Sequence, residues 1–195
     1  MQTTNVVLNG VDLERLALNI EAISGQPQLA KFQFRLNNQW VDGGYNQSVI
    51  QDFYGVGKED ESRDVPFILA NDEPDVLLGK DNAPNPAEYV LHALAGCLTT
   101  SIVYHAAARG YELKKVQTTL EGDLDLRGFL GIDPLVRKGY ENIKVIIDID
   151  GDFSEEEKNE ILTLTSFSPV LDIVTNRVPV NICLAETKNA ELIDC

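Results

Sequence analysis

Three cysteines and two histidines are the side chains in this sequence that could act as nucleophiles or metal ligands: Cys97, Cys183, Cys195, His92 and His105. No C-x-x-C pair occurs and their spacing matches no zinc-ligand pattern, so we expect no metal and no other cofactor. An odd set of three cysteines in a chain of 195 residues is also not typical of a disulfide framework. Each thiol therefore has to be judged singly.

Cys97 lies in the middle of an uncharged segment. Residues 89–108 contain no Asp, Glu, Lys or Arg, although 24% of the chain is charged. Asn85 and Pro86 before this segment are typical of an N-cap and a first helical position, and Gly110 after it is typical of a helix end. The pattern predicts a helix of about two dozen residues, roughly 36 Å long.

A membrane span and a buried helix are both compatible with this length. About twenty apolar residues cross a bilayer, but this segment is too polar to cross one alone, and the sequence has no second span that could pack against it. Its polar members are His92, Thr99, Thr100, Ser101, Tyr104 and His105. We therefore expect a buried helix and no membrane partner.

Burial of this helix on most sides requires more than one chain. A helix without a charged face has no side suited to water, and one thin domain rarely covers about 36 Å of helix all round. Small residues along the helix let another backbone approach, and Gly96 alone costs about 1 kcal/mol relative to alanine. We expect the same helix of a second copy to pack there, which predicts a homodimer with an isologous interface.

Cys97 could instead be a reactive thiol that the helix holds in a dry pocket. A cysteine in mid-helix gains nothing from the helix N-terminus, so an activated thiolate needs a cation from another segment. His105 lies eight residues on, roughly 80° round and 12 Å along the helix, and His92 is farther round. The residues alone leave both a reactive and an inert buried Cys97 open.

Composition describes the rest of the chain as an ordinary globular protein. Hydrophobic residues make up 44% of it, which is enough for a sizeable core. A net charge of −15 disfavours nucleic acid and anionic membranes as partners, because counterion release would not drive such binding. No basic and apolar leader precedes the first expected helix, so we expect a cytoplasmic location.

Periodicity predicts the elements on either side of the uncharged segment. The expected helices are residues 11–24, 86–109 and 154–167, and the expected strands are 31–40, 65–71, 116–126 with a possible bulge at Gly122, 143–149 and 177–184. Residues 51–64 are expected to be an exposed connection, and 185–195 a loose or weakly helical tail. This order is typical of an α+β fold with helices on an antiparallel sheet. We divide the chain into an N-terminal helix and strand arm, 1–64, and a core domain, 65–195.

Two segments resemble the OsmC/Ohr family of thiol-dependent peroxide-handling proteins. They are "PNPAEYVLHALAGCL", residues 84–98, and "SPVLDIVTNRVPVNI", residues 168–182. The resemblance covers about Phe67 to Leu184. It implies an OsmC-like α+β fold with antiparallel sheets and a long central helix, in an intertwined homodimer whose active pockets lie at the subunit interface.

The family resemblance also implies roles for individual residues. Family peroxidases use a peroxidatic cysteine, a resolving cysteine and an Arg-Glu pair that holds the thiolate. Cys97 matches the first, but the resolving cysteine would fall at Ser168, which cannot form a disulfide. The glutamate would fall at Ala87, so Glu88 next to it is the candidate, and Arg63 is the candidate arginine. The sequence therefore resembles the branch of the family that lacks the resolving cysteine.

Two functions follow from this resemblance. The first is one-cysteine reduction of organic hydroperoxides in oxidative-stress defence, with an external thiol, or Cys183 from elsewhere in the dimer, as the reductant. Cys183 is also interpreted as structural, because it alternates with apolar strand residues. The alternative is a non-catalytic dimer that binds a small apolar molecule in its interface pocket. The expected pocket residues, besides Cys97, are Tyr89, Leu94, Leu98, Tyr104, Phe167 and Ser168.

Overall fold

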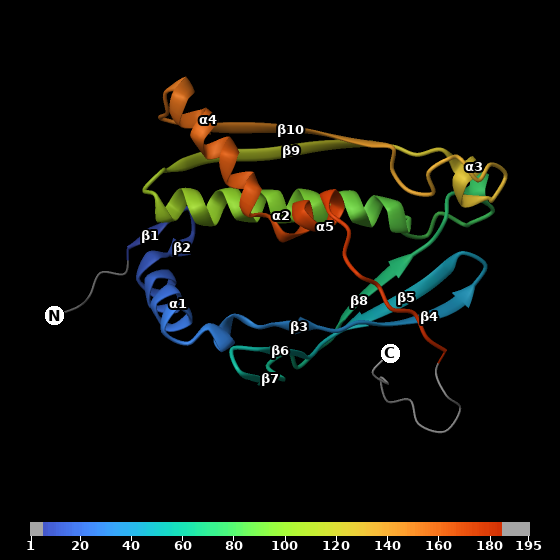
Figure 1. Ribbon diagram of the computed structural model, residues 1–195, viewed down its shortest axis with the longest axis horizontal. Helices are drawn as coiled ribbons and strands as arrows, with labels where there is room; N and C mark the ends of the chain where they lie inside the picture. The colour runs from blue at the N-terminus through green and yellow to red at the C-terminus, as the bar shows by residue number, and fades with distance from the viewer. Residues whose placement is uncertain (1–5, 185–195) are drawn as a thin grey trace.

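One layer of the structure is built on the long helix α2, Pro86–Ala108, and on two antiparallel strands, β9, Leu113–Asp123, and β10, Asn142–Gly151. The computed structural model describes residues 6–184, and Figure 1 shows β9 and β10 running along one side of α2. This part of the chain, residues 86–175, is called the helical layer below. Its other elements are α3, Leu126–Phe129; α4, Glu155–Thr163; η3, Leu164–Phe167; and α5, Pro169–Thr175.

The strand layer, residues 33–71, lies on the opposite side of α2 from β9 and β10 (Figure 1). It consists of two antiparallel three-stranded sheets, β3-β6-β7 and β4-β5-β8. The bounds are β3, Gln33–Phe34; β4, Asn37–Asp42; β5, Tyr45–Ile50; β6, Phe53–Gly55; β7, Lys58–Asp60; and β8, Phe67–Asn71. β5 pairs with β8, so one sheet spans the expected boundary between the arm and the core. The loop that follows β8 contains η2, Asp75–Leu77, and leads into α2.

A hairpin and a helix precede the strand layer. β1, Val7–Leu8, pairs with β2, Val11–Asp12, and α1, Leu13–Gly25, follows without a loop. The short helix η1, Pro27–Ala30, then leads to β3. The side chain of Asp12 caps α1 by accepting a hydrogen bond from the amide of Arg15, which confirms the helix that the sequence predicts here.

Local signals in the sequence determine both ends of α2. The side chain of Asn85 accepts a hydrogen bond from the Glu88 amide, and the Glu88 carboxylate accepts one from the Asn85 amide, both at 2.9 Å. This is a capping box, with Pro86 at the first helical position. Gly110 ends the helix with φ +83°, a conformation that favours glycine. The predicted helix is confirmed.

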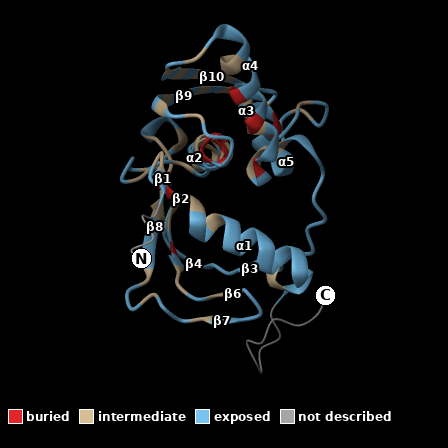
Figure 2. Cartoon of the chain, turned by 90° about the vertical axis from the view of Figure 1, so that its left-hand side faces the viewer, coloured by how far each residue is buried: buried red, intermediate tan, exposed pale blue. Residues whose placement is uncertain are grey.

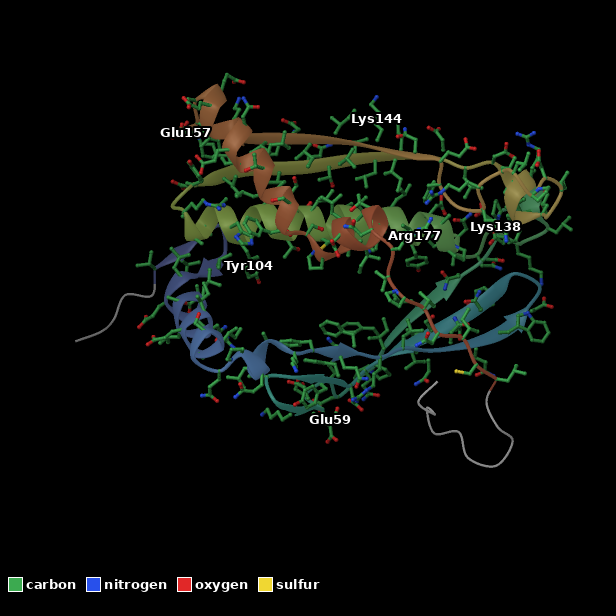
Figure 3. All side chains as sticks on the ribbon, in the orientation of Figure 1. Glu59, Tyr104, Lys138, Lys144, Glu157 and Arg177 are labelled. Atoms are coloured by element: carbon green, nitrogen blue, oxygen red, sulfur yellow. The ribbon has the colours of Figure 1, made fainter. Side chains whose placement is uncertain are left out.

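β9 and β10 present one apolar and one charged face. Alternate residues such as Val116 and Ile147 face the helical core, whereas Lys115 pairs with Asp148 at 2.6 Å on the exposed face. Figure 3 shows Lys144 on that outer side as well. The bulge expected at Gly122 is wrong, because the register shift lies between Asp150 and Gly151 instead.

Tyr140 explains why residue 122 is a glycine. A side chain at Gly122 would collide with the Tyr140 ring. The Tyr140 hydroxyl also donates a hydrogen bond to the Ala87 carbonyl at 2.8 Å. The loop between β9 and β10 is thereby fixed to the first turn of α2.

The hydrophobic core belongs almost entirely to the helical layer. Among the described residues, the buried hydrophobic side chains are Val11, Leu94, Leu98, Ile102, Ala106, Ala107, Ile161 and Leu164. All of these except Val11 come from α2, α4 or η3. Figure 2 shows the strand layer and α1 almost wholly without buried residues. The core therefore lies between α2, the β9–β10 pair and the segment that carries α4 and η3.

The predicted strand at residues 177–184 is wrong for the single chain. The structure has no strand there, and the apolar side chains of Val180, Ile182 and Leu184 are exposed. A strand forms only where another strand pairs with it, and no described strand pairs with this segment. The expected tail, 185–195, lies outside the described residues.

The connection expected at residues 51–64 is also wrong in part. β6 and β7 form a hairpin there, closed by Val56 and Gly57, both with positive φ. The single strand expected at residues 31–40 is wrong as well, because β3 and β4 divide this segment between two sheets. The fold class is as predicted: an α+β fold with antiparallel sheets and a long central helix.

Candidate functional site

Cys97 lies at the border between the buried and the exposed side of α2. Leu94 and Ser101, three residues before it and four after it, are buried in the helical layer. Ala93 and Thr100, four residues before it and three after it, are exposed. Since residues three and four apart are neighbours on a helix, the half-buried thiol of Cys97 has core on one side and open surface on the other.

The exposed side of α2 is an uncharged stripe. It consists of Val90, Ala93, Gly96, Thr100, Tyr104 and Ala108. Figure 3 shows Tyr104 on the side of α2 that faces away from β9 and β10. A side chain built at Gly96 would meet no atom of residues 6–184 within 4 Å, so nothing in this part of the chain requires a small residue at this position.

Cys97 is the free cysteine of the described residues. Cys183 is not a free thiol in the structure. Cys195, at the chain end, lies outside the described residues. Cys97 is therefore the described thiol that could react with a small molecule.

Glu88 is not brought to Cys97 by α2. The two residues are nine positions apart, which places them on opposite sides of the helix and about 13.5 Å apart along its axis. The Glu88 carboxylate is also engaged in the capping box with Asn85. Within one chain, Glu88 stabilises the beginning of α2.

Arg63 lies in the strand layer, where its guanidinium group stacks against two aromatic rings. The guanidinium carbon is 5.0 Å from the ring centre of Phe53 and 5.3 Å from that of Phe67. Its Nη1 donates a hydrogen bond of 2.8 Å to the carbonyl of Gln51. These contacts engage the guanidinium group within the strand layer.

Ser168 is fully buried at the first turn of α5. Its hydroxyl accepts a hydrogen bond of 3.1 Å from the amide of Leu171 and so caps the helix. α5 packs on α2, so the position expected for a resolving residue lies beside the helix that carries Cys97. A hydroxyl at this position cannot form a disulfide.

The expected pocket residues divide between two environments. Leu94 and Leu98 are part of the core, whereas Tyr104 and Phe167 are exposed. The hydroxyl of Tyr89 donates a hydrogen bond to the Ala70 carbonyl at the end of β8, which ties α2 to the strand layer.

His105 and Phe167 form an aromatic pair that the sequence analysis did not identify. Their rings are stacked with centres 4.0 Å apart, and the Arg109 guanidinium lies 5.8 Å from the Phe167 ring centre. Burial, together with the charge of Arg109, lowers the pKa of His105, so the imidazole is neutral at pH 7. The contact joins α2 to η3, which are 62 residues apart in the sequence at this pair, and no local pattern reveals it.

An apolar cavity of about 520 Å³ lies at the beginning of α2. It is lined by Leu69, Pro84, Glu88, Tyr89 and His92. Two of these residues are expected site residues, and the others come from β8, the loop before α2 and α2 itself. Among residues 6–184, no cluster of His, Cys, Asp or Glu could hold a metal ion.

α2 is long and apolar enough to cross a membrane by length and composition alone. In the chain, however, β9, η3 and α5 pack along it. A two-stranded ribbon beside a membrane-spanning helix would leave unpaired backbone groups in lipid, which is very unfavourable. The packing therefore favours a core helix.

Comparisons with known proteins agree with this fold. Residues 79–182 match the family model of the OsmC-like protein. No curated protein matches the sequence. The matched segment contains all of α2 and the whole helical layer.

Several solved structures share the fold at low sequence identity. An OsmC-like protein from Mycoplasma pneumoniae has a TM-score of 0.57 and 16% identity, over 74% of this chain and 89% of that one. An organic hydroperoxide resistance protein OsmC from Legionella pneumophila has a TM-score of 0.52 and 17% identity, over 73% of this chain and 88% of that one. An osmotic stress induced and detoxification response protein from Psychrobacter arcticus has a TM-score of 0.52 and 14% identity, over 69% and 83% of the two chains. The family model covers more than half of the chain, and the chain therefore belongs to the OsmC-like family.

Proposed function

We propose that this protein is a homodimer that reduces organic hydroperoxides at Cys97 in oxidative-stress defence. The position of the free, half-buried Cys97 beside an exposed uncharged stripe carries the proposal. The similar Legionella protein is an organic hydroperoxide resistance protein, which supports this chemistry.

The surface of the single chain supports the dimer. A folded monomer of 21.6 kDa is expected to expose about 9,200 Å², whereas this chain exposes 14,875 Å². The sixteen residues outside the described range could account for at most about 2,600 Å² of the excess if fully unfolded. The remaining excess of about 3,000 Å² per chain, or about 6,000 Å² for a pair, is the size of a large obligate homodimer interface.

The uncharged stripe of α2 is the centre of the proposed interface. An exposed helix face without charge is unfavourable in water, and its small residues allow a second α2 to approach closely. Gly96 costs about 1 kcal/mol in a helix, and no atom in the described part of its own chain lies where its side chain would be, so a second backbone explains it. In this dimer Cys97 lies at the edge of the interface, where the partner excludes water from the thiol.

The proposed reaction has two steps. The Cys97 thiolate attacks the terminal oxygen of the hydroperoxide; the O–O bond breaks, the alcohol leaves with a proton, and Cys97 becomes a sulfenic acid. One external thiol then forms a mixed disulfide with release of water, and a second thiol restores Cys97 and leaves as the disulfide. An external reductant is needed because Ser168 is a hydroxyl and Cys183 is not a free thiol. The reducing cytoplasm supplies such thiols, and we place the protein there.

Trapping of the sulfenic acid tests this function. The protein is treated with cumene hydroperoxide and a dimedone probe, and the modified cysteine is identified by mass spectrometry. We expect labelling at Cys97, at least about tenfold faster than for free cysteine at the same pH, and none in Cys97→Ser. Labelling no faster than for free cysteine, with the dimer intact, would rule out the peroxidase.

Binding of a small apolar molecule is the second candidate function, and the 520 Å³ cavity at the beginning of α2 favours it. Native mass spectrometry of the purified dimer would then show a co-purified ligand. His92→Trp, which fills this cavity, would remove the ligand without changing the reactivity of Cys97. An inert Cys97 together with such a ligand favours this function over the first.

A further inference from the structure

α1 begins just after a turn that is hydrogen-bonded to the end of α2 and the start of β9. Asn9 and Gly10 form the turn between β1 and β2, with φ +52° and +78°. The Asn9 side chain donates a hydrogen bond of 2.9 Å to the Tyr111 carbonyl and accepts one of 2.8 Å from the Leu113 amide. These two bonds join residues more than one hundred positions apart and fix the start of α1 next to the end of α2.

The segment after α1 is fixed to the strand layer. The Phe32 ring lies so close to Gly55 that a side chain there would collide with it, and Phe32 stacks on Phe53 with ring centres 6.3 Å apart. Leu29 lies against Gly57 in the same sheet. α1 therefore connects the two layers and is held at both ends, as Figure 1 shows.

The described residues 6–184 leave most of α1 exposed. None of its residues is buried, and its main contacts with other described helices and strands are those with its neighbours β2 and η1. Leu13, Leu16, Ile20 and Ile23 nevertheless form an apolar stripe at three- and four-residue steps. A helix of 13 residues is marginal in water without tertiary packing, so the helix needs a neighbour for this stripe.

We propose that α1 is an intermolecular clamp whose apolar stripe packs on a second copy of this chain. This rests on the dimer proposed above. The excess surface of about 3,000 Å² per chain is larger than two crossing α2 helices alone would bury, so further elements must contribute to the interface. α1 starts beside the end of α2 that carries Tyr104, where the uncharged stripe of α2 ends (Figure 3).

A bilayer is a poorer occupant for this face. Helices that lie on membranes carry Lys and Arg on their polar face, whereas the polar residues of α1 include Glu14, Arg15 and Glu21. The stripe therefore suits an uncharged protein surface, and a second copy of this chain provides one.

Matched substitutions on opposite faces of α1 test the clamp. Ile20 and Leu18 have nearly equal exposure in the single chain, 56% and 60%, but lie about 160° apart round the helix. In sedimentation velocity over a dilution series, Ile20→Glu should raise the dissociation constant of the dimer at least about tenfold over that of Leu18→Glu. Ile23→Ala, a milder change on the same stripe, should weaken the dimer in the same direction, and far-UV circular dichroism checks that each variant is folded.

The outcomes show separately whether the clamp fails and whether the dimer fails. Equal dissociation constants for Ile20→Glu and Leu18→Glu, with a dimeric wild type, overturn the clamp and leave the dimer intact. A wild type that is monomeric throughout the series overturns both. A larger effect of Leu18→Glu would place the contact on the other face of α1 and also overturns the clamp.

Discussion

The two layers of this molecule differ in how much of their own core they contain. The helical layer buries Leu94, Ile102, Ile161 and Leu164 almost completely within one chain. The strand layer has no buried large hydrophobic residue, although Phe34, Trp40 and Phe67 belong to it. Aromatic residues of this size are normally among the main contributors to a core. A single chain therefore completes the core of one layer only, which supports the proposed dimer.

The largest effect is expected where the core is complete. Ile102→Ala leaves a cavity between α2 and η3, so the free energy of unfolding should fall by about 2–5 kcal/mol in a urea titration. Ile68→Ala, in the strand layer, should cost much less in a dissociated chain, in which Ile68 is exposed. Equal losses in the free energy of unfolding for both variants in the dissociated protein would contradict the difference between the layers.

Substitution of Gly96 by a large residue should stabilise an isolated α2 but weaken a dimer in which a second α2 packs on it. If α2 had only its own chain as neighbour, both Gly96→Ala and Gly96→Leu would stabilise the helix by up to about 1 kcal/mol, since no atom lies within 4 Å of a side chain there. With a second α2 against this position, Gly96→Leu should weaken the dimer at least about tenfold, or about 1.4 kcal/mol. Sedimentation equilibrium of the two variants measures this, and a Leu variant as dimeric as the Ala variant contradicts the packing.

A smaller effect is expected from restoring a thiol at Ser168. Ser168→Cys removes the cap of α5, at a cost of about 1 kcal/mol in the free energy of unfolding. Because α5 packs on α2, we expect a disulfide with Cys97 after one equivalent of cumene hydroperoxide, seen as a tryptic cross-link by mass spectrometry. Oxidation that stops at the sulfenic acid in this variant would show that the two positions do not meet.

The smallest expected effect on the free energy of unfolding occurs only in acidic solution. It comes from the loop after β8. The buried Asp72 carboxylate accepts hydrogen bonds from the amides of Glu73, Lys80 and Asn82 and from the Asn82 side chain. These bonds, the Asn82 amide foremost, lower the pKa of Asp72 below its ordinary 3.8. Its contribution to stability is therefore complete above the unfolded pKa and is lost as the pH falls through the lower folded one.

Asp72→Asn isolates this contribution. Urea midpoints measured from pH 7 down to pH 3 should fall less steeply in the variant than in the wild type, because the titrating carboxylate is gone. Parallel curves for the two proteins would mean that the loop does not depend on this charge.

Local signals explain which elements could be predicted from the sequence. Asn85, Pro86 and Gly110 determine the ends of α2 through contacts within a few residues, so the prediction was accurate. The β6–β7 hairpin was missed because Val56 occupies a turn position with φ +52°, where Asn or Gly is the usual signal. The strand expected at 177–184 has an alternating pattern but no partner strand in the described chain.

The candidate site was predictable only as far as single residues. The sequence identifies Cys97, and the helix that carries it follows from periodicity. Its surroundings depend on segments far apart in the chain, such as the pairing of His105 with Phe167. Glu88 shows the limit of inference from a neighbouring position, because nine residues of helix place it on the side of α2 opposite to Cys97.

The mass of the protein in dilute solution tests the central claim most directly. If the uncharged stripe of α2 packs on a second copy, sedimentation equilibrium from micromolar to nanomolar concentration should give twice the 21.6 kDa of one chain. A folded species of 21.6 kDa that persists across this range would contradict the account, because the stripe and the strand layer would then be stable in water without a partner.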